Sequence, residues 1–196
     1  MSRIFVFLAS LLLAIPAVAQ TSKRASFEKA VQQLLTALKK NDNRAFKQFI
    51  DAKTGFYLLY RSGVFDQYLH LRSTNLNDHT KYPETNIAYS GSIPSKLNYT
   101  TMPVYDCDTD KWTKTGSFAD TSGKLTPVSA IAANLVKYDL QKVSKKEMQQ
   151  LKAIERQSWK VVLANKKGDH CVFYLAWRNK RWVLAVFDTV TTDCSA

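Results

Sequence analysis

Near the amino end of the chain, apolar residues recur every three or four positions, which is the spacing of an amphipathic helix. The predicted helix covers residues 26–40 and begins at Ser26, a favourable N-cap. The sequence Asn41-Asp42-Asn43 ends this pattern, and a second, shorter helix is predicted at 44–51. The apolar stripe of the first helix consists of Phe27, Val31, Leu34, Leu35 and Leu38.

Two more helices are predicted in the second half of the chain, over residues 128–138 and 143–155. Thr126, which is followed by a proline, suits the N-cap of the first of these helices. Ser144 and Glu147 form a capping box at the start of the second. This is the clearest helix start in the sequence.

Three strands are predicted at the carboxyl end, over 159–164, 170–177 and 182–190. Each is rich in β-branched, aromatic or other apolar residues, and polar turns separate them. An antiparallel meander preceded by helices indicates an α+β fold in a single domain.

The register of the last predicted hairpin follows from the length of its turn. A four-residue loop over 178–181 places Trp177 opposite Trp182 and Tyr174 opposite Ala185.

An earlier strand is predicted at 56–61, which is apolar and aromatic throughout. The following segment, 63–73, is ambiguous, because Tyr68 and Leu71 fit one face of a helix but the segment is short. Residues 73–127 are a polar, turn-rich insertion, and long irregular regions of this kind are usually functional. Short strands inside it are predicted at 86–89, 102–106 and 111–118.

The two amino-terminal helices ending in "KKNDNRAFKQFID", the strand after them and the closing "CVFYLAWRNKRWVLAVFDTV" resemble secreted cystatin-like or NTF2-like proteins. The resemblance covers residues 26–61 and 158–190. It implies helices packed on a curved antiparallel sheet that ends in a three-strand meander, with a cone-shaped cavity between helix and sheet. It implies no single activity, because this family includes enzymes, ligand binders and partner-binding modules.

Residues 1–19 have the three parts of a secretory signal peptide. Arg3 is followed by an apolar run over 4–15 and by the small-residue cleavage site Ala17-Val18-Ala19. The apolar run is too short for a transmembrane helix. The sequence therefore predicts cleavage near Ala19 and an exported domain, residues 20–196, in the periplasm or outside the cell.

The formal net charge of +12 changes the choice of expected partners. The basic residues are scattered through the sequence and form no long run, so a nucleic-acid-binding arm is not predicted. A basic exported surface favours an anionic glycan, a lipid headgroup or an acidic protein as its partner.

The three cysteines, Cys107, Cys171 and Cys194, allow three different disulfide pairings. We favour Cys107–Cys194, because both residues follow an aspartate in a polar, loop-like segment. Cys171 lies in a predicted strand, where a buried free thiol is the simpler interpretation.

The stretch "YDCDTDKW" partly resembles a calcium-binding loop. Asp106, Asp108 and Asp110 match the first three ligand positions of an EF-hand, but Lys111 and Ser117 stand where it needs glycine and glutamate. An acidic turn is therefore the favoured interpretation. No metal site, cofactor motif or catalytic set is predicted from the sequence.

Aromatic residues supply the candidate binding site. Seven of the nine tyrosines lie between residues 57 and 105, and Trp112 follows closely. We expect an exported, non-catalytic domain that binds a small ligand, glycan or protein through an aromatic-rich pocket or loop. The alternatives are a small secreted enzyme with a pocket in an NTF2-like sheet and a structural envelope protein. Under either alternative, the aromatic side chains would belong to ordinary packing. The candidate ligand-binding residues are Tyr60, Arg61, Tyr68, Tyr105 and Trp112.

Overall fold

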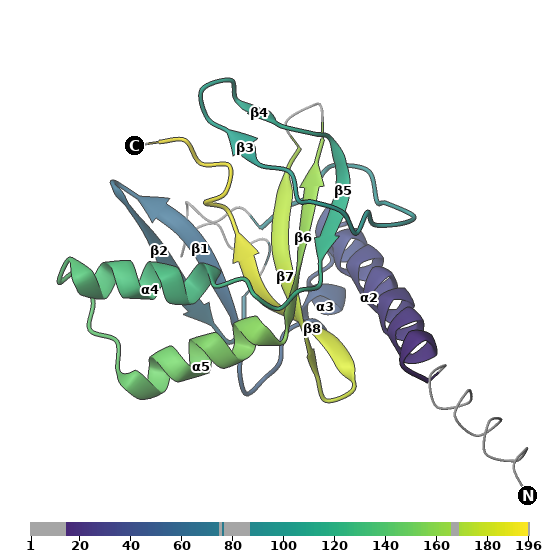
Figure 1. Cartoon of the computed structure of the whole chain (residues 1–196), viewed down its shortest axis with the longest axis horizontal. Helices are drawn as coiled ribbons and strands as arrows, with labels where there is room; N and C mark the ends of the chain where they lie inside the picture. The colour runs from purple at the N-terminus through teal and green to yellow at the C-terminus, as the bar shows by residue number, and fades with distance from the viewer. Residues whose placement is uncertain (1–14, 75, 77–86, 166–168, 196) are drawn as a thin grey trace, which may run out of the picture.

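The computed structural model describes residues 15–74, 76, 87–165 and 169–195, with side chains from residue 22 onward. Its strands are β1 (Phe56–Ser62), β2 (Phe65–Leu71), β3 (Tyr105–Asp106), β4 (Lys111–Trp112), β5 (Gly116–Asp120), β6 (Ser158–Ala164), β7 (Cys171–Arg178) and β8 (Arg181–Asp188). Six of them form one sheet in the order β2-β1-β8-β7-β6-β5, and β3 pairs with β4 in a separate hairpin (Figure 1). The pairs in the sheet are antiparallel except β1 and β8, which are parallel. The α+β fold and the closing meander β6-β7-β8 are therefore confirmed.

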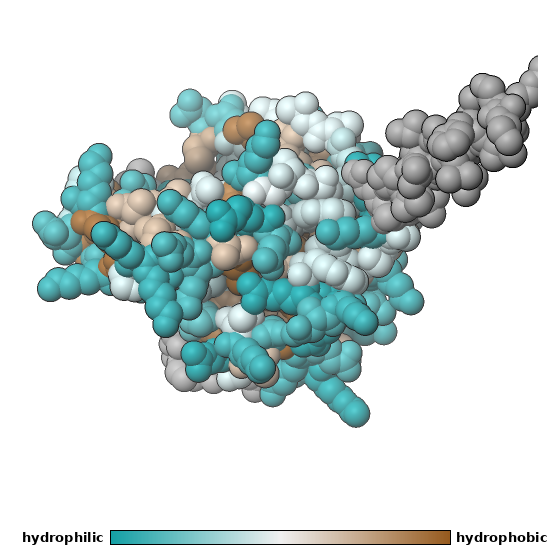
Figure 2. Space-filling model, turned by 60° about the horizontal axis from the view of Figure 1, so that its bottom comes forward, coloured by the Kyte–Doolittle hydropathy of each residue, from teal (hydrophilic) through white to brown (hydrophobic). Residues whose placement is uncertain are grey.

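Helices cover both faces of the sheet. On one face lie α2 (Ile15–Lys39) and the short α3 (Asn43–Lys47), and on the other lie α4 (Pro127–Lys137) and α5 (Lys145–Arg156) (Figure 1). The result is a three-layer arrangement with two separate hydrophobic cores. Hydrophilic residues dominate the exterior of these layers in the view of Figure 2.

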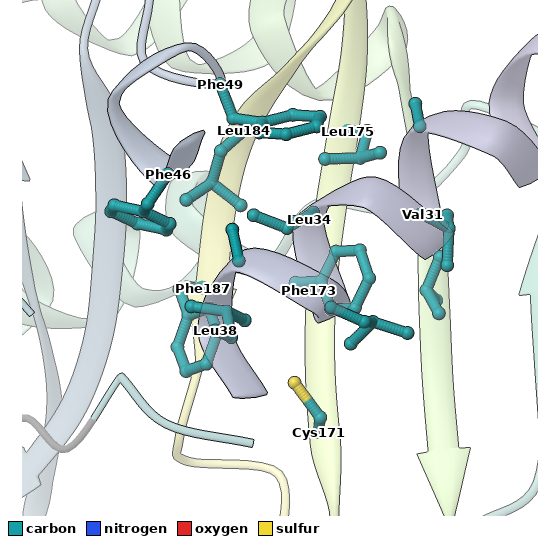
Figure 3. Packing of buried hydrophobic residues seen from close by; sticks show 14 of the residues in the cluster. Val31, Leu34, Leu38, Phe46, Phe49, Cys171, Phe173, Leu175, Leu184 and Phe187 are labelled. Atoms are coloured by element: carbon teal, nitrogen blue, oxygen red, sulfur yellow. The ribbon is translucent and has the colours of Figure 1, made fainter. Parts of the chain in front are cut away.

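The first core lies between α2 and the meander. The predicted stripe of α2 is buried, with no stripe residue more than 3% exposed. Figure 3 shows Val31, Leu34 and Leu38 of the helix lying over Phe173 and neighbouring side chains of β7 and β8. These side chains pack the inner face of the helix directly against the strands.

The second core is closed by α4 and α5, whose starts are capped differently. The Ser144 hydroxyl accepts a hydrogen bond from the Glu147 amide at 3.1 Å, which is one of the two bonds of the predicted capping box. The Glu147 carboxylate accepts from the Tyr68 hydroxyl at 3.5 Å. Thr126 occupies the N-cap position of α4, but its side chain makes no capping bond. Instead Glu155 Oε1 on α5 accepts from the amides of Val128 and Ser129, both at 2.8 Å.

Glu155 is only 2% exposed, and its second oxygen is also used. The Ser129 hydroxyl donates to Glu155 Oε2 at 2.6 Å. Burial raises the pKa of Glu155, and the hydrogen bonds from Ser129 and Val128 oppose that shift. One buried carboxylate of α5 thus satisfies the first free amides of α4 and joins the two helices.

The structure corrects or decides several sequence-based expectations. The first helix begins at Ile15 and not at Ser26, so Ser26 lies inside α2 and is not its N-cap; its hydroxyl donates to the Lys23 carbonyl at 2.8 Å. The ambiguous segment after β1 is strand β2, not a helix, because it pairs along its whole length with β1 through a tight turn at Gly63, where φ is +80°. In the last hairpin Trp177 faces Trp182 as predicted, but Tyr174 faces Val186. A register shift between Tyr174 and Leu175 leaves Ala185 as an extra residue on β8, which the loop length alone does not predict.

The insertion over 73–127 contains less strand than predicted. Within 86–89, residues 87–89 are not in a strand, although Ile87 and Tyr89 are buried against the first core. Residue 86 lies outside the described part. Only the end of 102–106 is a strand, and 111–118 is divided between β4 and β5. Burial of apolar side chains without a paired strand explains the wrong prediction at 87–89.

Candidate functional site

The five residues predicted to bind a ligand do not form one site. Tyr60 lies on the opposite face of β1 from Arg61, because successive side chains of a strand alternate. The Tyr60 hydroxyl donates to Gln67 Oε1 at 2.8 Å. Tyr68 packs against the second core, and its hydroxyl accepts from Gln141 Nε2 at 3.2 Å. Burial, aided by Glu147, raises the pKa of Tyr68 to about 12.

Arg61 holds the carboxyl-terminal tail. Its guanidinium pairs with Asp66 at 2.7 Å and donates to the carbonyls of Asp193 and Ser195 at 2.5 and 2.9 Å. Between these two carbonyls stands Cys194, which forms a disulfide with Cys107 and so confirms the favoured pairing. Cys171 is a buried free thiol, as predicted.

Tyr105 and Trp112 face each other across the β3–β4 hairpin, with ring centroids 5.1 Å apart. The Trp112 indole donates to His170 Nδ1 at 3.0 Å, and the Tyr105 hydroxyl donates to Asp110. Asp106 holds the turn of the hairpin, accepting from the Asp108 amide and the Thr109 hydroxyl. These contacts fix the hairpin against the sheet, and ligand binding by the five residues stays a prediction.

A cavity on another part of the molecule is the stronger candidate for a binding site. It is a groove of about 660 Å³ between α2, the α3 segment and the β7–β8 turn, and its size is that of an ordinary ligand site. We call it the basic groove. Its basic and tryptophan lining residues are Lys29, Lys40, Lys180, Arg181, Trp177 and Trp182.

The lysines of the basic groove are not neutralised by the protein. Within the described part of the chain, no salt bridge or side-chain hydrogen bond involves Lys29, Lys40 or Lys180. The one lining carboxylate, Asp42, accepts from the amides of Arg44 and Ala45 and thereby caps α3. The groove therefore presents an excess of positive charge to solvent.

A cluster of aromatic rings forms one wall of the groove. Trp177 is 37% exposed and contacts Trp182, with ring centroids 5.2 Å apart. Trp182 is buried between Phe27 and Trp159, and its indole donates to the Ser26 hydroxyl at 3.1 Å. The exposed ring is thus held in place by rings behind it, which gives the groove a rigid, partly apolar surface.

No catalytic set accompanies the groove among the described residues. The three buried carboxylates cap backbone groups: Glu155 caps α4, while Asp51 and Asp188 each hold a turn that contains a threonine. Burial raises the pKa of the Cys171 thiol and lowers that of the Lys160 ammonium, but neither residue lines a described cavity. No group of three or more metal-ligating side chains occurs in the described ranges.

A second cavity, of about 590 Å³, is lined by residues that include Tyr89, Asp169 and His170. Burial lowers the pKa of His170, while Asp110 and Asp169 oppose that shift.

The sequence contains a pattern that could have indicated the basic groove, but the candidate site was chosen from the number of tyrosines. Trp177 and Trp182 flank a turn that carries Lys180 and Arg181, and all four belong to the lining. The missing information was the position of α2, because Lys29 and Lys40 reach the groove from a helix far away in sequence. No family model, curated protein or solved structure matches the chain.

Proposed function

We propose that this protein is an exported, non-catalytic binding domain whose basic groove takes an anionic glycan. The observation that carries the proposal is the combination, in one cavity, of the exposed Trp177 ring with three lysines that have no partner in the described part of the chain. An indole offers a flat apolar surface that suits the face of a sugar ring. The ammonium groups of the lysines that line the same cavity favour carboxylate, sulfate or phosphate substituents.

The groove favours a glycan over the other expected partners. A protein partner generally needs a larger and flatter area than this cavity provides. A purely apolar ligand would leave the lysines and the neighbouring Gln33 unused. An anionic sugar chain uses both the aromatic wall and the charged rim.

Export and kinship belong to the same proposal. We propose cleavage near Ala19, so the mass of the protein recovered from the periplasm or medium should correspond to a chain that begins at Gln20.

The kinship with cystatin-like or NTF2-like proteins is supported by the long helix α2 on the closing meander. The second helical layer and the parallel β1–β8 pair depart from the pattern that the resemblance implies.

Calorimetric titration with a uronic acid hexasaccharide, and with a neutral hexasaccharide of the same length, tests the function. We expect the mature wild type to bind the anionic sugar at least about tenfold more tightly than the neutral one, a difference of about 1.4 kcal/mol. Trp177→Ala and the triple variant of Lys29, Lys40 and Lys180 to alanine should each weaken binding of the anionic sugar at least about tenfold.

A matched triple variant controls for total charge. Lys53, Lys111 and Lys124 are exposed and lie outside the groove, so their replacement by alanine removes the same charge and should change the affinity less than about twofold. Equal weakening by the two triple variants would reduce the interaction to non-specific attraction. Absence of binding by the wild type would contradict the proposed ligand class.

A further inference from the structure

Five apolar residues from two turns gather at the end of the molecule opposite α2. Val64 and Phe65 belong to the β1–β2 turn and the start of β2, and the others lie at the carboxyl end of α4 and just after it. The two segments touch, because the rings of Phe65 and Tyr138 have centroids 5.0 Å apart. We call this set the apolar corner. Its members are Val64, Phe65, Val136, Tyr138 and Leu140.

Four of these side chains are turned toward solvent. The exposed fractions are 79% for Val64, 55% for Leu140, 52% for Tyr138 and 41% for Val136. Figure 2 shows hydrophobic residues bordered by hydrophilic ones at the end of the molecule that carries the α4–α5 turn in Figure 1. A clustered apolar patch with a polar rim marks an interaction surface more often than a scattered apolar residue does.

The backbone holds the corner in this exposed form. After α4, the amides of Leu140 and Gln141 both donate to the Leu135 carbonyl, at 2.8 and 3.3 Å. Asp139 between α4 and Leu140 adopts a φ of +54°, which turns the chain sharply. The exposure of Leu140 is therefore built into a hydrogen-bonded turn.

Four lysines lie within or directly after the part of the chain that carries Val136, Tyr138 and Leu140. Lys137 lies with its ammonium 5.2 Å from the centroid of the Tyr138 ring, and three further exposed lysines follow between the turn and the first turn of α5. The nearest exposed acidic residue in this stretch is Asp139, and Glu147 is partly buried beside Tyr68. The three further lysines are Lys142, Lys145 and Lys146.

We infer that the apolar corner docks on an anionic lipid surface. Protruding valine, leucine and tyrosine side chains suit insertion at the boundary between headgroups and acyl chains, and the flanking lysines suit lipid phosphates. Across the described residues, no helix combines the length and apolarity that a membrane crossing requires.

Charge distinguishes this occupant from a second copy of the chain. A two-fold symmetric contact would bring the same lysines of both copies together, and like charges at an interface oppose association. The shape of the corner also favours lipid, because exposed apolar side chains protrude from two separate segments of the chain. Protrusions insert readily into a deformable surface.

Vesicle co-sedimentation with the mature protein tests the inference. The probes are vesicles of phosphatidylcholine alone and of equal parts phosphatidylcholine and phosphatidylglycerol. We expect binding only to the vesicles that contain phosphatidylglycerol, with affinity falling as salt is added. The double variant Val64→Ser/Leu140→Ser should bind at least about tenfold more weakly while retaining the fold, because both side chains are exposed.

A charge-matched pair of variants tests the role of the lysines. Replacing Lys142, Lys145 and Lys146 by glutamine should weaken vesicle binding at least about tenfold, since each lysine near an anionic surface contributes about fivefold. Replacing Lys53, Lys111 and Lys124 by glutamine should have a much smaller effect, because they lie away from the corner. As a direct readout of insertion, Leu140→Trp should show indole fluorescence that brominated phosphatidylglycerol quenches beyond the wild-type level.

Several outcomes would overturn the inference. They are failure of the wild type to bind either vesicle, equal binding by the serine double variant, and equal weakening by both glutamine triples. Self-association that the serine variant abolishes, without vesicle binding, would assign the corner to a second copy. Capture of an acidic protein in the same circumstances would assign it to a protein partner. None of these results bears on glycan binding, because the basic groove shares no residue with the apolar corner.

Discussion

The two faces of the sheet are closed by different chemistry. On the first face every buried side chain of α2 is apolar, and the helix packs on the meander without a polar contact at its centre. On the second face α4 and α5 also bury apolar residues, but a buried carboxylate, Glu155, joins the two helices. The first arrangement depends on shape and volume, whereas the second also depends on a set of hydrogen bonds that cannot be left incomplete.

The largest expected loss comes from the apolar face. Leu34 of α2 is fully buried in the first core, so Leu34→Ala removes packed atoms and leaves a cavity. We expect the free energy of unfolding to fall by about 4 kcal/mol, measured by urea denaturation. Gln33→Ala, at an exposed position of the same helix, should change it by less than about 0.5 kcal/mol. Similar values for the two variants would mean that α2 contributes little to the first core.

The buried carboxylate should matter nearly as much as a core leucine. Glu155→Ala leaves the amides of Val128 and Ser129 and the Ser129 hydroxyl without their acceptor, and we expect a loss of about 3 kcal/mol. Glu155→Gln should cost clearly less, because an amide oxygen can still accept from both backbone amides and the amide nitrogen can donate to the hydroxyl. Equal losses in urea denaturation of the two variants would show that packing, not capping, explains the role of Glu155.

The dependence of stability on pH gives a second comparison between the wild type and Glu155→Gln. Burial raises the pKa of Glu155 above its ordinary value, so the favourable contribution of its protonated form is complete at low pH. That contribution is lost as the pH rises through the raised pKa. Relative to Glu155→Gln, the wild type should therefore lose stability over the range of pH that begins near the ordinary glutamate pKa of about 4.3 and extends upward. A constant difference between the two proteins over that range would contradict the raised pKa.

The same contrast between the faces explains how much the sequence could predict. The stripe of α2, the meander and the start of α5 were predicted, because each depends on spacing within a few turns or strands. The disulfide was favoured because two cysteines share a polar context while the third lies in an apolar strand. In each of these cases the local pattern and the tertiary structure agree.

The features that the sequence missed or left open depend on contacts that the local pattern of residues does not indicate. Val64, Tyr68 and Leu71 are spaced as on a helix, but pairing with β1 makes this segment a strand. The cap of α4 comes from Glu155, 27 positions beyond Val128, and no local motif indicates it. The basic groove combines α2 with the β7–β8 turn, so its lysines and tryptophans are separate in the sequence. The candidate tyrosines were chosen because many tyrosines lie close together in the sequence. Their number does not show in which direction their side chains point.

The smallest expected effects come from the N-cap residues of α5 and α4. The N-cap side chain of α5 makes a capping hydrogen bond, and the N-cap side chain of α4 makes none. Ser144→Ala removes an acceptor for the Glu147 amide, and we expect a loss of about 1 kcal/mol. Thr126→Ala removes a side chain that makes no capping bond, because Glu155 already accepts from the first amides of α4, so the loss should stay within about 0.5 kcal/mol. The two substitutions are alike in chemistry and differ only in what satisfies the helix. Denaturation of the two variants in the Glu155→Ala background adds a further test, because that background leaves the amides of Val128 and Ser129 without their acceptor. There the effect of Thr126→Ala should grow only if the threonine hydroxyl can take over the capping. An equal loss for Ser144→Ala and Thr126→Ala in the wild-type background would mean that the distant carboxylate does not replace the local cap.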